Sequence, residues 1–103
     1  MRSMPLPERV AVVAEVNAKP EFIEDVKREC IALVEPSRAV KGCLSYDLHQ
    51  YIHDPRHFVF VESWESIEDI ETHLESPHAI NFDEKTLGML AEPERIIYLK
   101  RID

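Results

Sequence analysis

Glu62, Trp64 and His73 are the residues whose types and spacing most clearly suggest chemistry. Successive side chains of a strand point to opposite faces, so Glu62 and Trp64 share one face of the strand predicted at residues 57–64. A glutamate on a mostly buried strand needs a partner, because burial alone raises its pKa. His73 lies at the border of the apolar stripe of a predicted short helix, so we expect it to meet Glu62. In this pair His73 is the candidate base and Glu62 orients it.

His78 is the second candidate base, at the start of the next predicted helix. Trp64, Tyr46 and Phe82 are candidate substrate-binding residues, because their planar side chains could wall a pocket for a flat aromatic ligand. Structural roles are the alternatives. Trp64 could be a core residue, the Glu62–His73 pair could simply join strand to helix, and His78 could be an exposed side chain at a helix N-terminus.

Apolar periodicity and turn residues predict the elements that must position these side chains. The predicted order is a strand at 9–18, a helix from 19 to about 36, strands at 43–52 and 57–64, a short helix from 66, a helix from 77 to about 90, and a strand at 94–102. This β-α-β-β-α(α)-β order predicts an α+β, ferredoxin-like βαββαβ fold. Its four-stranded antiparallel sheet would carry helices on one face.

The first and third predicted strands are apolar on both faces, as Val12 and Val13 and then Phe60 and Val61 illustrate. An antiparallel sheet that is bare on one side normally has polar residues on that side. Helices would cover one face only. We therefore expect a second copy of the chain to cover the other face, in an obligate homodimer.

Length and charge exclude several classes of protein. A chain of 103 residues is one domain, here residues 9–103 after an N-terminal extension at 1–8. Its 12 Lys and Arg against 20 Asp and Glu give a net charge of −8, which argues against nucleic acid as a partner. It has no membrane-length apolar run and no secretory signal, so we expect a cytoplasmic protein without membrane contact. Cys30 and Cys43 are expected to be reduced, although their spacing alone also permits a disulfide.

Metal and cofactor motifs are missing from the sequence. His73 and His78 are five residues apart with Pro77 between them, a spacing at which one helix would not present a chelating pair. There is no glycine-rich phosphate loop or dinucleotide fingerprint. No serine or cysteine nucleophile motif occurs either. We predict no metal and no tightly bound cofactor.

The run FVFVESW at 58–64, followed by His73 and then Ser76-Pro77-His78, resembles the antibiotic biosynthesis monooxygenase domain. The segment GCLSY at 42–46 is similar to that family's entry into its second strand. The resemblance extends from about residue 9 to residue 102 and implies a dimeric α+β barrel. The family includes cofactor-independent oxygenases of quinols and polyketide anthrones, haem-degrading enzymes, and an isomerase of a phosphorylated signalling molecule. Val13 and Asp83 stand where the haem-degrading branch usually has asparagine and histidine, so haem degradation is disfavoured.

This resemblance implies a cofactor-independent monooxygenase that uses O₂ on a small aromatic or quinol-like compound. Such chemistry asks a base to remove a phenolic proton and a pocket to exclude water. One alternative is a non-catalytic protein that binds a quinone-like compound. Another is an isomerase or decarboxylase of a small molecule, in which Arg38 or Lys85 would hold a phosphate or carboxylate.

Overall fold

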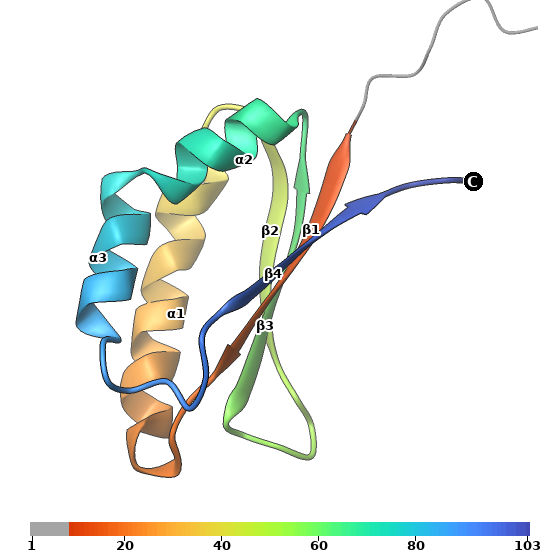
Figure 1. The fold of residues 1–103 in the computed structure, drawn as a ribbon. Coiled ribbons are helices and arrows are strands. Elements are labelled where there is room, and N and C mark those ends of the chain that lie inside the picture. The colour runs from red at the N-terminus through yellow and green to blue at the C-terminus, as the bar shows by residue number, and fades with distance from the viewer. Residues whose placement is uncertain (1–8) are drawn as a thin grey trace, which may run out of the picture.

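The computed structural model describes residues 9–103, and its elements follow the predicted order (Figure 1). The N-terminal extension predicted at residues 1–8 lies outside the described residues. The elements are β1 (Val10–Asn17), the 3-10 turn η1 (Pro20–Phe22), α1 (Ile23–Arg38), β2 (Cys43–Gln50), β3 (His57–Trp64), α2 (Ile67–Leu74), α3 (Pro77–Lys85) and β4 (Arg95–Lys100).

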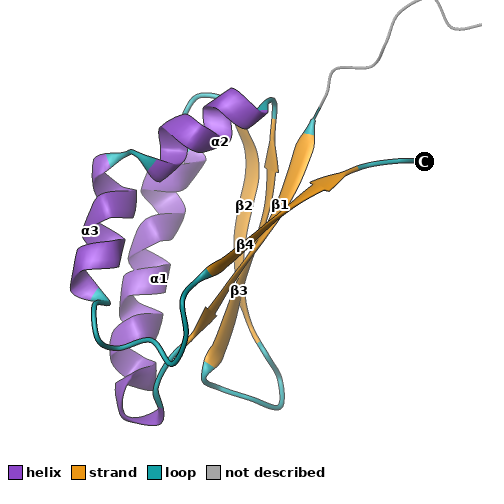
Figure 2. Cartoon of the chain, viewed as in Figure 1, coloured by secondary structure: helices purple, strands orange, loops and turns teal. Residues whose placement is uncertain are grey.

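The four strands form one antiparallel sheet in the order β2-β3-β1-β4. The three helices all lie on one side of this sheet, and no helix of residues 9–103 lies on the other side (Figure 2). This is the ferredoxin-like α+β arrangement, and the predicted fold class is confirmed. In the register of the central strands, Val13 lies opposite both Val61 of β3 and Ile97 of β4.

Local sequence explains where the helices begin. The hydroxyl of Ser66 accepts a hydrogen bond from the Asp69 backbone N–H and caps α2, as the sequence predicted. Ser76 caps α3 in the same way through the backbone N–H of Ala79, and Pro77 occupies the first turn. Both serines fix the chain direction just before the helices that line the pocket described below.

Several element boundaries differ from the prediction. The last helix ends at Lys85 rather than near residue 90, because the chain turns through Gly88 at φ 83°. β2 ends at Gln50, and the exposed Ile52 belongs to the turn. β4 spans Arg95–Lys100 instead of 94–102, so the chain beyond Lys100 makes no ladder bonds within the described residues.

The core lies between the sheet and the helices. Alternate residues of β1 and β3 point into it, and the large members are almost fully buried: Val12, Val16, Phe58, Phe60 and Trp64. Val26, Cys30 and Leu33 of α1 complete it from the helical side. Burial of each large side chain stabilises the fold by about 1.5–3 kcal/mol, so this layer supplies most of the driving force.

The opposite face of the sheet stays partly exposed. Val61 is 45% exposed and Leu99 is also 45% exposed, although both lie in strands. The prediction that the central strands are apolar on two faces is therefore confirmed for this chain. No helix among residues 9–103 is long and apolar enough to cross a membrane. Cys30 and Cys43 are both free thiols.

Candidate functional site

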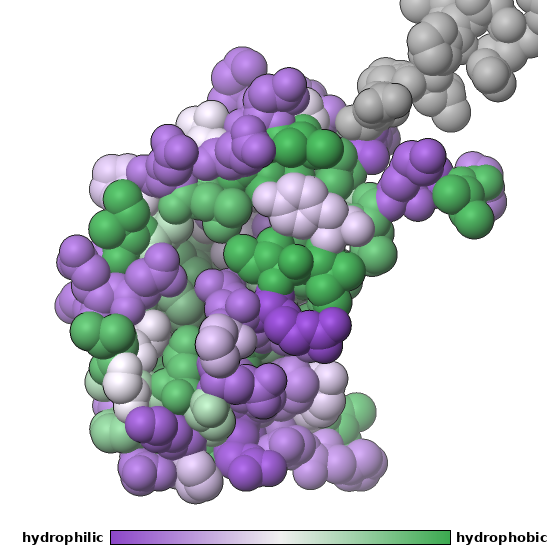
Figure 3. All heavy atoms as spheres, in the orientation of Figure 1, coloured by the Kyte–Doolittle hydropathy of each residue, from purple (hydrophilic) through white to green (hydrophobic). Residues whose placement is uncertain are grey.

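A pocket lies between the sheet and the short helices α2 and α3. Strands supply its floor through Val12, Ala14 and Tyr46, and the helices supply Leu74 and Phe82. Leu74 and Ile96 are 38% and 36% exposed, so they mark the side on which the pocket meets solvent. Figure 3 shows apolar surface between α2 and β4 on this side of the molecule.

His73 lines the pocket from α2 and is only 5% exposed. Its Nε2 lies 2.9 Å from the hydroxyl oxygen of Ser37, a fully buried residue in the last turn of α1. Burial, and then the nearby charge of His78, lower the pKa of His73 to about 4. The imidazole is therefore neutral near pH 7, available to accept or donate one proton in a hydrogen bond.

Glu62 lines the same pocket from β3 and is also 5% exposed. Its Oε1 accepts a hydrogen bond of 2.8 Å from the indole Nε1 of Trp64. Burial raises the pKa of Glu62 to about 7, against the opposing effect of the Trp64 hydrogen bond. Glu62 thus changes its protonation in the neutral range, where a general base is most effective.

The predicted contact of Glu62 with His73 is wrong. Trp64 lies two residues after Glu62 on the same face of the strand, and its indole N–H donates to the Glu62 carboxylate in place of His73. His73 instead meets Ser37, which lies 36 residues earlier in the sequence and comes beside α2 only through packing of the helices. Glu62 and His73 line one pocket, but each is hydrogen-bonded to a different residue.

Two of the three predicted substrate-binding residues line the pocket, and the third does not. Tyr46 and Phe82 line the pocket, and they are 3% and 4% exposed. Trp64 is fully buried and does not line the pocket, so it packs against residues that do. The ring centroid of His73 lies 5.0 Å from that of Trp64 and 5.5 Å from that of Tyr46. His73 is therefore packed between two aromatic rings.

His78, the second candidate base, does not line the pocket. It is half-buried at the start of α3, where its Nε2 lies 3.1 Å from the Ser76 hydroxyl. Its ring centroid is 5.2 Å from that of His73. Its position makes it a neighbour of His73 rather than a second group facing a ligand.

Glu94 is the pocket residue that the sequence did not single out. It directly precedes β4 and stands two residues before Ile96, so the two side chains point to the same face of the sheet and line the same pocket. Burial, followed by the negative charge of Asp83, raises the pKa of Glu94 to about 7. The alternation of Glu94, Ile96 and Tyr98 is the sequence signal that could have found it.

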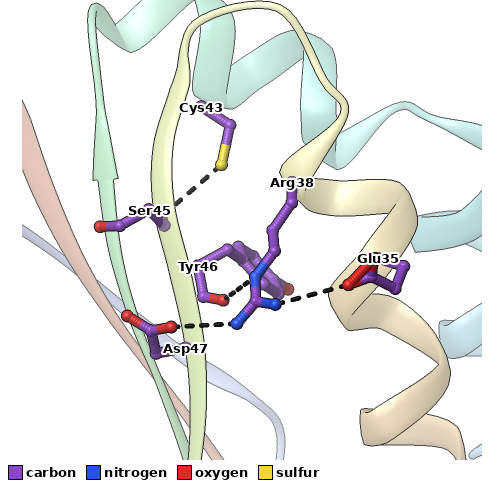
Figure 4. A network of polar contacts seen from close by, with 6 residues as sticks. All are labelled: Glu35, Arg38, Cys43, Ser45, Tyr46 and Asp47. Carbon is purple, nitrogen blue, oxygen red and sulfur yellow. Dashed lines mark hydrogen bonds and ion pairs between the residues drawn. The ribbon is translucent and has the colours of Figure 1, made fainter.

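Arg38 and Lys85, the predicted sources of a basic group, lie elsewhere. Arg38 reaches from α1 to β2, where its Nε donates to the Tyr46 carbonyl at 3.0 Å (Figure 4). Its terminal nitrogens pair with Asp47 at 3.1 Å and Glu35 at 3.4 Å. Lys85 is exposed at the end of α3. Neither side chain lines the pocket, so the idea that one of them holds an anion there is wrong.

The hollow is small, with a volume of about 50 Å³. A closed apolar cavity that holds a benzene ring measures about 150 Å³. An aromatic ring can therefore enter only in part, unless side chains at the mouth move. Within residues 9–103, no three His, Cys, Asp or Glu side chains are grouped so that they could hold a metal ion.

The fold and the position of the pocket define a class, the ferredoxin-like α+β domains with a site between sheet and helices. A solved structure, PA3566 from Pseudomonas aeruginosa, superposes with a TM-score of 0.88 at 35% identity and covers 93% of this chain and 96% of its own. Rv0793 from Mycobacterium tuberculosis, provisionally named a monooxygenase, is 30% identical over 91% of this chain and 92% of its own length.

The family follows from a direct match. The family model described as antibiotic biosynthesis monooxygenase matches residues 9–85, and the chain belongs to that family. The protein sll1783 of Synechocystis is 33% identical over 84% of this chain, which spans only 59% of that relative. The family match covers Tyr46, Glu62, His73 and Phe82 but ends before Glu94.

Proposed function

We propose that this protein is a cofactor-independent monooxygenase of a small aromatic, quinol-like compound. The observation that supports it best is that Glu62 and His73 line one pocket together with the rings of Tyr46 and Phe82. The family supports the reaction class, and a relative named as a monooxygenase aligns over almost the whole chain.

The proposed chemistry begins with a phenolic proton. Glu62, whose pKa is about 7, takes that proton, and neutral His73 holds a substrate oxygen by a hydrogen bond. The resulting anion is electron-rich and reduces O₂ within a site that limits water. In the overall balance, one hydroquinone and one O₂ give one hydroxyquinone and one water. One oxygen atom enters the ring, the other becomes water, and the substrate supplies the electrons.

Entry of the ring requires movement or protrusion at the mouth, because the hollow holds only about 50 Å³. Leu74 and Ile96 are the side chains with room to move, since both are more than one third exposed. We propose that a ring inserts between them, with its hydroxyl group toward Glu62.

Oxygen uptake with a panel of hydroquinones, catechols and anthrones tests the function. We expect consumption above the rate in buffer, with isotopically labelled O₂ delivering one atom to the product. Glu62→Gln keeps the shape and an acceptor for Trp64 but removes the base, and it should slow turnover at least about tenfold. Glu68→Gln, at an exposed position of α2, is the matched control and should leave the rate unchanged.

Two results would decide against this function. Uptake no faster than autoxidation in buffer for every compound would rule out the oxygenase. If a quinone then still quenched Trp64 fluorescence saturably, the protein would be a binding protein instead. Equal rates for the wild type and Glu62→Gln would remove Glu62 from the mechanism.

We also propose that the bare sheet face is covered by a second copy of the chain. The support is its apolar centre, formed by Val13, Val61 and Ile97 in register. Val61→Asp should convert a dimer to monomers in light scattering coupled to size exclusion. The control is Leu87→Asp, because Leu87 is 84% exposed and lies after α3, away from the sheet. A monomeric wild type would refute the dimer.

The cytoplasm is the proposed location. Its support is that Cys30 and Cys43 are both free thiols, a state typical of a reducing compartment. Fractionation of cells that express the full chain tests it, and recovery outside the cytoplasmic fraction would refute it.

A further inference from the structure

The titratable groups of the pocket are mostly acids, which accept hydrogen bonds when ionised and are neutral when protonated. Glu62, Asp83 and Glu94 are carboxyls, and His73 is the remaining titratable side chain that lines the pocket besides Tyr46. No lysine or arginine is among the described residues that line it. A pocket built to hold a phosphate or a carboxylate normally places such a cation against the ligand.

Two pairs of these carboxyls repel each other, Asp83 with Glu94 and Glu94 with Glu62. The negative charge of Asp83 raises the pKa of Glu94, and the charge of Glu94 raises that of Glu62, in each case after the larger effect of burial. Glu94 is the carboxyl common to both pairs: its negative charge acts on Glu62, and the negative charge of Asp83 acts on Glu94. It is also the first residue before β4, so the strand fixes its side chain on the pocket face.

Two arginines that adjoin pocket residues, Arg38 beside Tyr46 and Arg95 after Glu94, are used on other surfaces. Arg38 is paired with Asp47 and Glu35 between α1 and β2 (Figure 4). Arg95 lies next to Glu94 in sequence, but its guanidinium is 3.5 Å from Glu15. In the cross-strand register Glu15 and Arg95 are partners one position away from Ala14 and Ile96, so they face the opposite side of the sheet. Their charge does not compensate the carboxyls of the pocket.

His73 does not supply positive charge either. Its environment is apolar and aromatic, its Nε2 is held by the Ser37 hydroxyl, and burial lowers its pKa to about 4. An anion in this pocket would therefore meet carboxyls without any counter-charge, in a partly closed site where such repulsion is poorly screened. A neutral phenol meets the same carboxyls as a hydrogen-bond donor.

We propose that the pocket selects uncharged phenolic ligands over their carboxylate or phosphate derivatives, and that Glu94 is the residue that sets this selectivity. The proposal rests on the proposed function for the kind of ligand, a hydroxylated aromatic ring. It adds the charge of that ligand and a specificity-determining residue outside the part of the chain that the family model matches.

A binding experiment without oxygen separates this proposal from turnover. Calorimetry at about pH 7.5 compares hydroquinone, 2,5-dihydroxybenzoate and the methyl ester of that acid, since the acid is ionised at this pH. The acid and its ester differ in charge but little in shape. For the wild type we expect the acid to bind at least about tenfold more weakly than the ester.

Variants then assign the effect. In Glu94→Gln the ratio of the acid's Kd to the ester's should fall at least about threefold, mainly through tighter binding of the acid. Glu92→Gln, at an exposed position two residues earlier, should leave the ratio unchanged. Asp83→Asn is the second variant, with a smaller change in the same direction, and it serves if Glu94→Gln does not fold.

Equal binding of the acid and the ester to the wild type would overturn the proposal. A folded Glu94→Gln that leaves the ratio unchanged would also overturn it, and so would an unchanged ratio in Asp83→Asn if Glu94→Gln does not fold. The absence of binding by both hydroquinone and the ester would overturn it as well. A clear preference for the ester without any oxygen consumption would instead support the selectivity and count against the oxygenase.

Discussion

The indole of Trp64 holds the carboxylate of Glu62 through a hydrogen bond of 2.8 Å between side chains two positions apart on β3. The indole is fully buried and the glutamate is 5% exposed, so water competes little for either group. Trp64 therefore acts on the site through the position and charge of Glu62, although it does not line the pocket itself.

Replacing Trp64 by phenylalanine tests this relationship. The hydrogen bond lowers the pKa of Glu62, so its removal in Trp64→Phe should raise that pKa above about 7. Loss of a bond to a charged group should also cost about 1.5–3 kcal/mol of unfolding free energy at a pH where Glu62 is ionised. Carboxyl NMR titration and urea denaturation measure the two effects.

A double-mutant cycle isolates the bond from the loss of packing. In the Glu62→Gln background the bond is to a neutral amide, so the hydrogen-bond part of the cost of Trp64→Phe should fall by about half while the packing part stays. An equal cost in both backgrounds would show that Trp64 contributes packing alone.

The ionisable groups of the pocket give the stability of the fold a distinctive pH dependence. The folded pKa values of Glu62 and Glu94 are raised from 4.5 to about 7, so the folded state binds more protons, and their contribution to stability is lost as pH rises through this window. The folded pKa of His73 is lowered from 6.5 to about 4, so the contribution of His73 to stability grows as pH rises through that range. Between about pH 4.5 and 6.5 the net effect is one extra proton in the folded state, or about 1.4 kcal/mol lost per pH unit.

Removal of one carboxyl checks this sign. In Glu94→Gln the slope of unfolding free energy against pH should become less negative by about 1.4 kcal/mol per unit over that window. Urea denaturation at a series of pH values measures the slope for both proteins. Parallel slopes would mean that Glu94 titrates at its ordinary pKa in the folded chain.

The fold was largely predictable because strand alternation and helix caps are local signals. The short apolar run at 58–64 and the serines at 66 and 76 are sufficient to place β3, α2 and α3. The partners within the site were not predictable, since Ser37 meets His73 only when α1 and α2 pack against the same sheet. Glu94 looks like a surface acid after a proline, and only its alternation with Ile96 and Tyr98 indicates that it faces the pocket.

The two glycines form a matched pair for a test of packing at α2. Gly42 and Gly88 have φ of 86° and 83°, so alanine at either position strains the backbone. A Cβ on Gly42 would also overlap the Asp69 side chain, whereas one on Gly88 meets open space. In urea denaturation we expect Gly88→Ala to cost about 1 kcal/mol and Gly42→Ala about 1–3 kcal/mol more. Equal costs would mean that the Asp69 side chain moves aside freely.

The two thiols should differ in reactivity. Cys30 is fully buried, and burial raises its pKa to about 12. Cys43 is half-buried at the start of β2, and its pKa is raised to a lesser extent, chiefly by burial. A thiol reagent at about pH 8 should label Cys43 at least about tenfold faster, because the thiolate is the reactive form. Cys43→Ser should abolish the fast phase, and persistence of that phase would assign it to Cys30.

β4 joins two surfaces of the molecule through adjacent residues. Ile96 lines the pocket, and the next residue, Ile97, lies opposite Val13 on the bare face of the sheet. Neighbouring residues of a strand share a backbone, so a ligand that shifts the backbone of Ile96 also shifts Ile97. If that face is a subunit contact, ligand binding and assembly are thermodynamically linked, and each shifts the equilibrium constant of the other by the same factor.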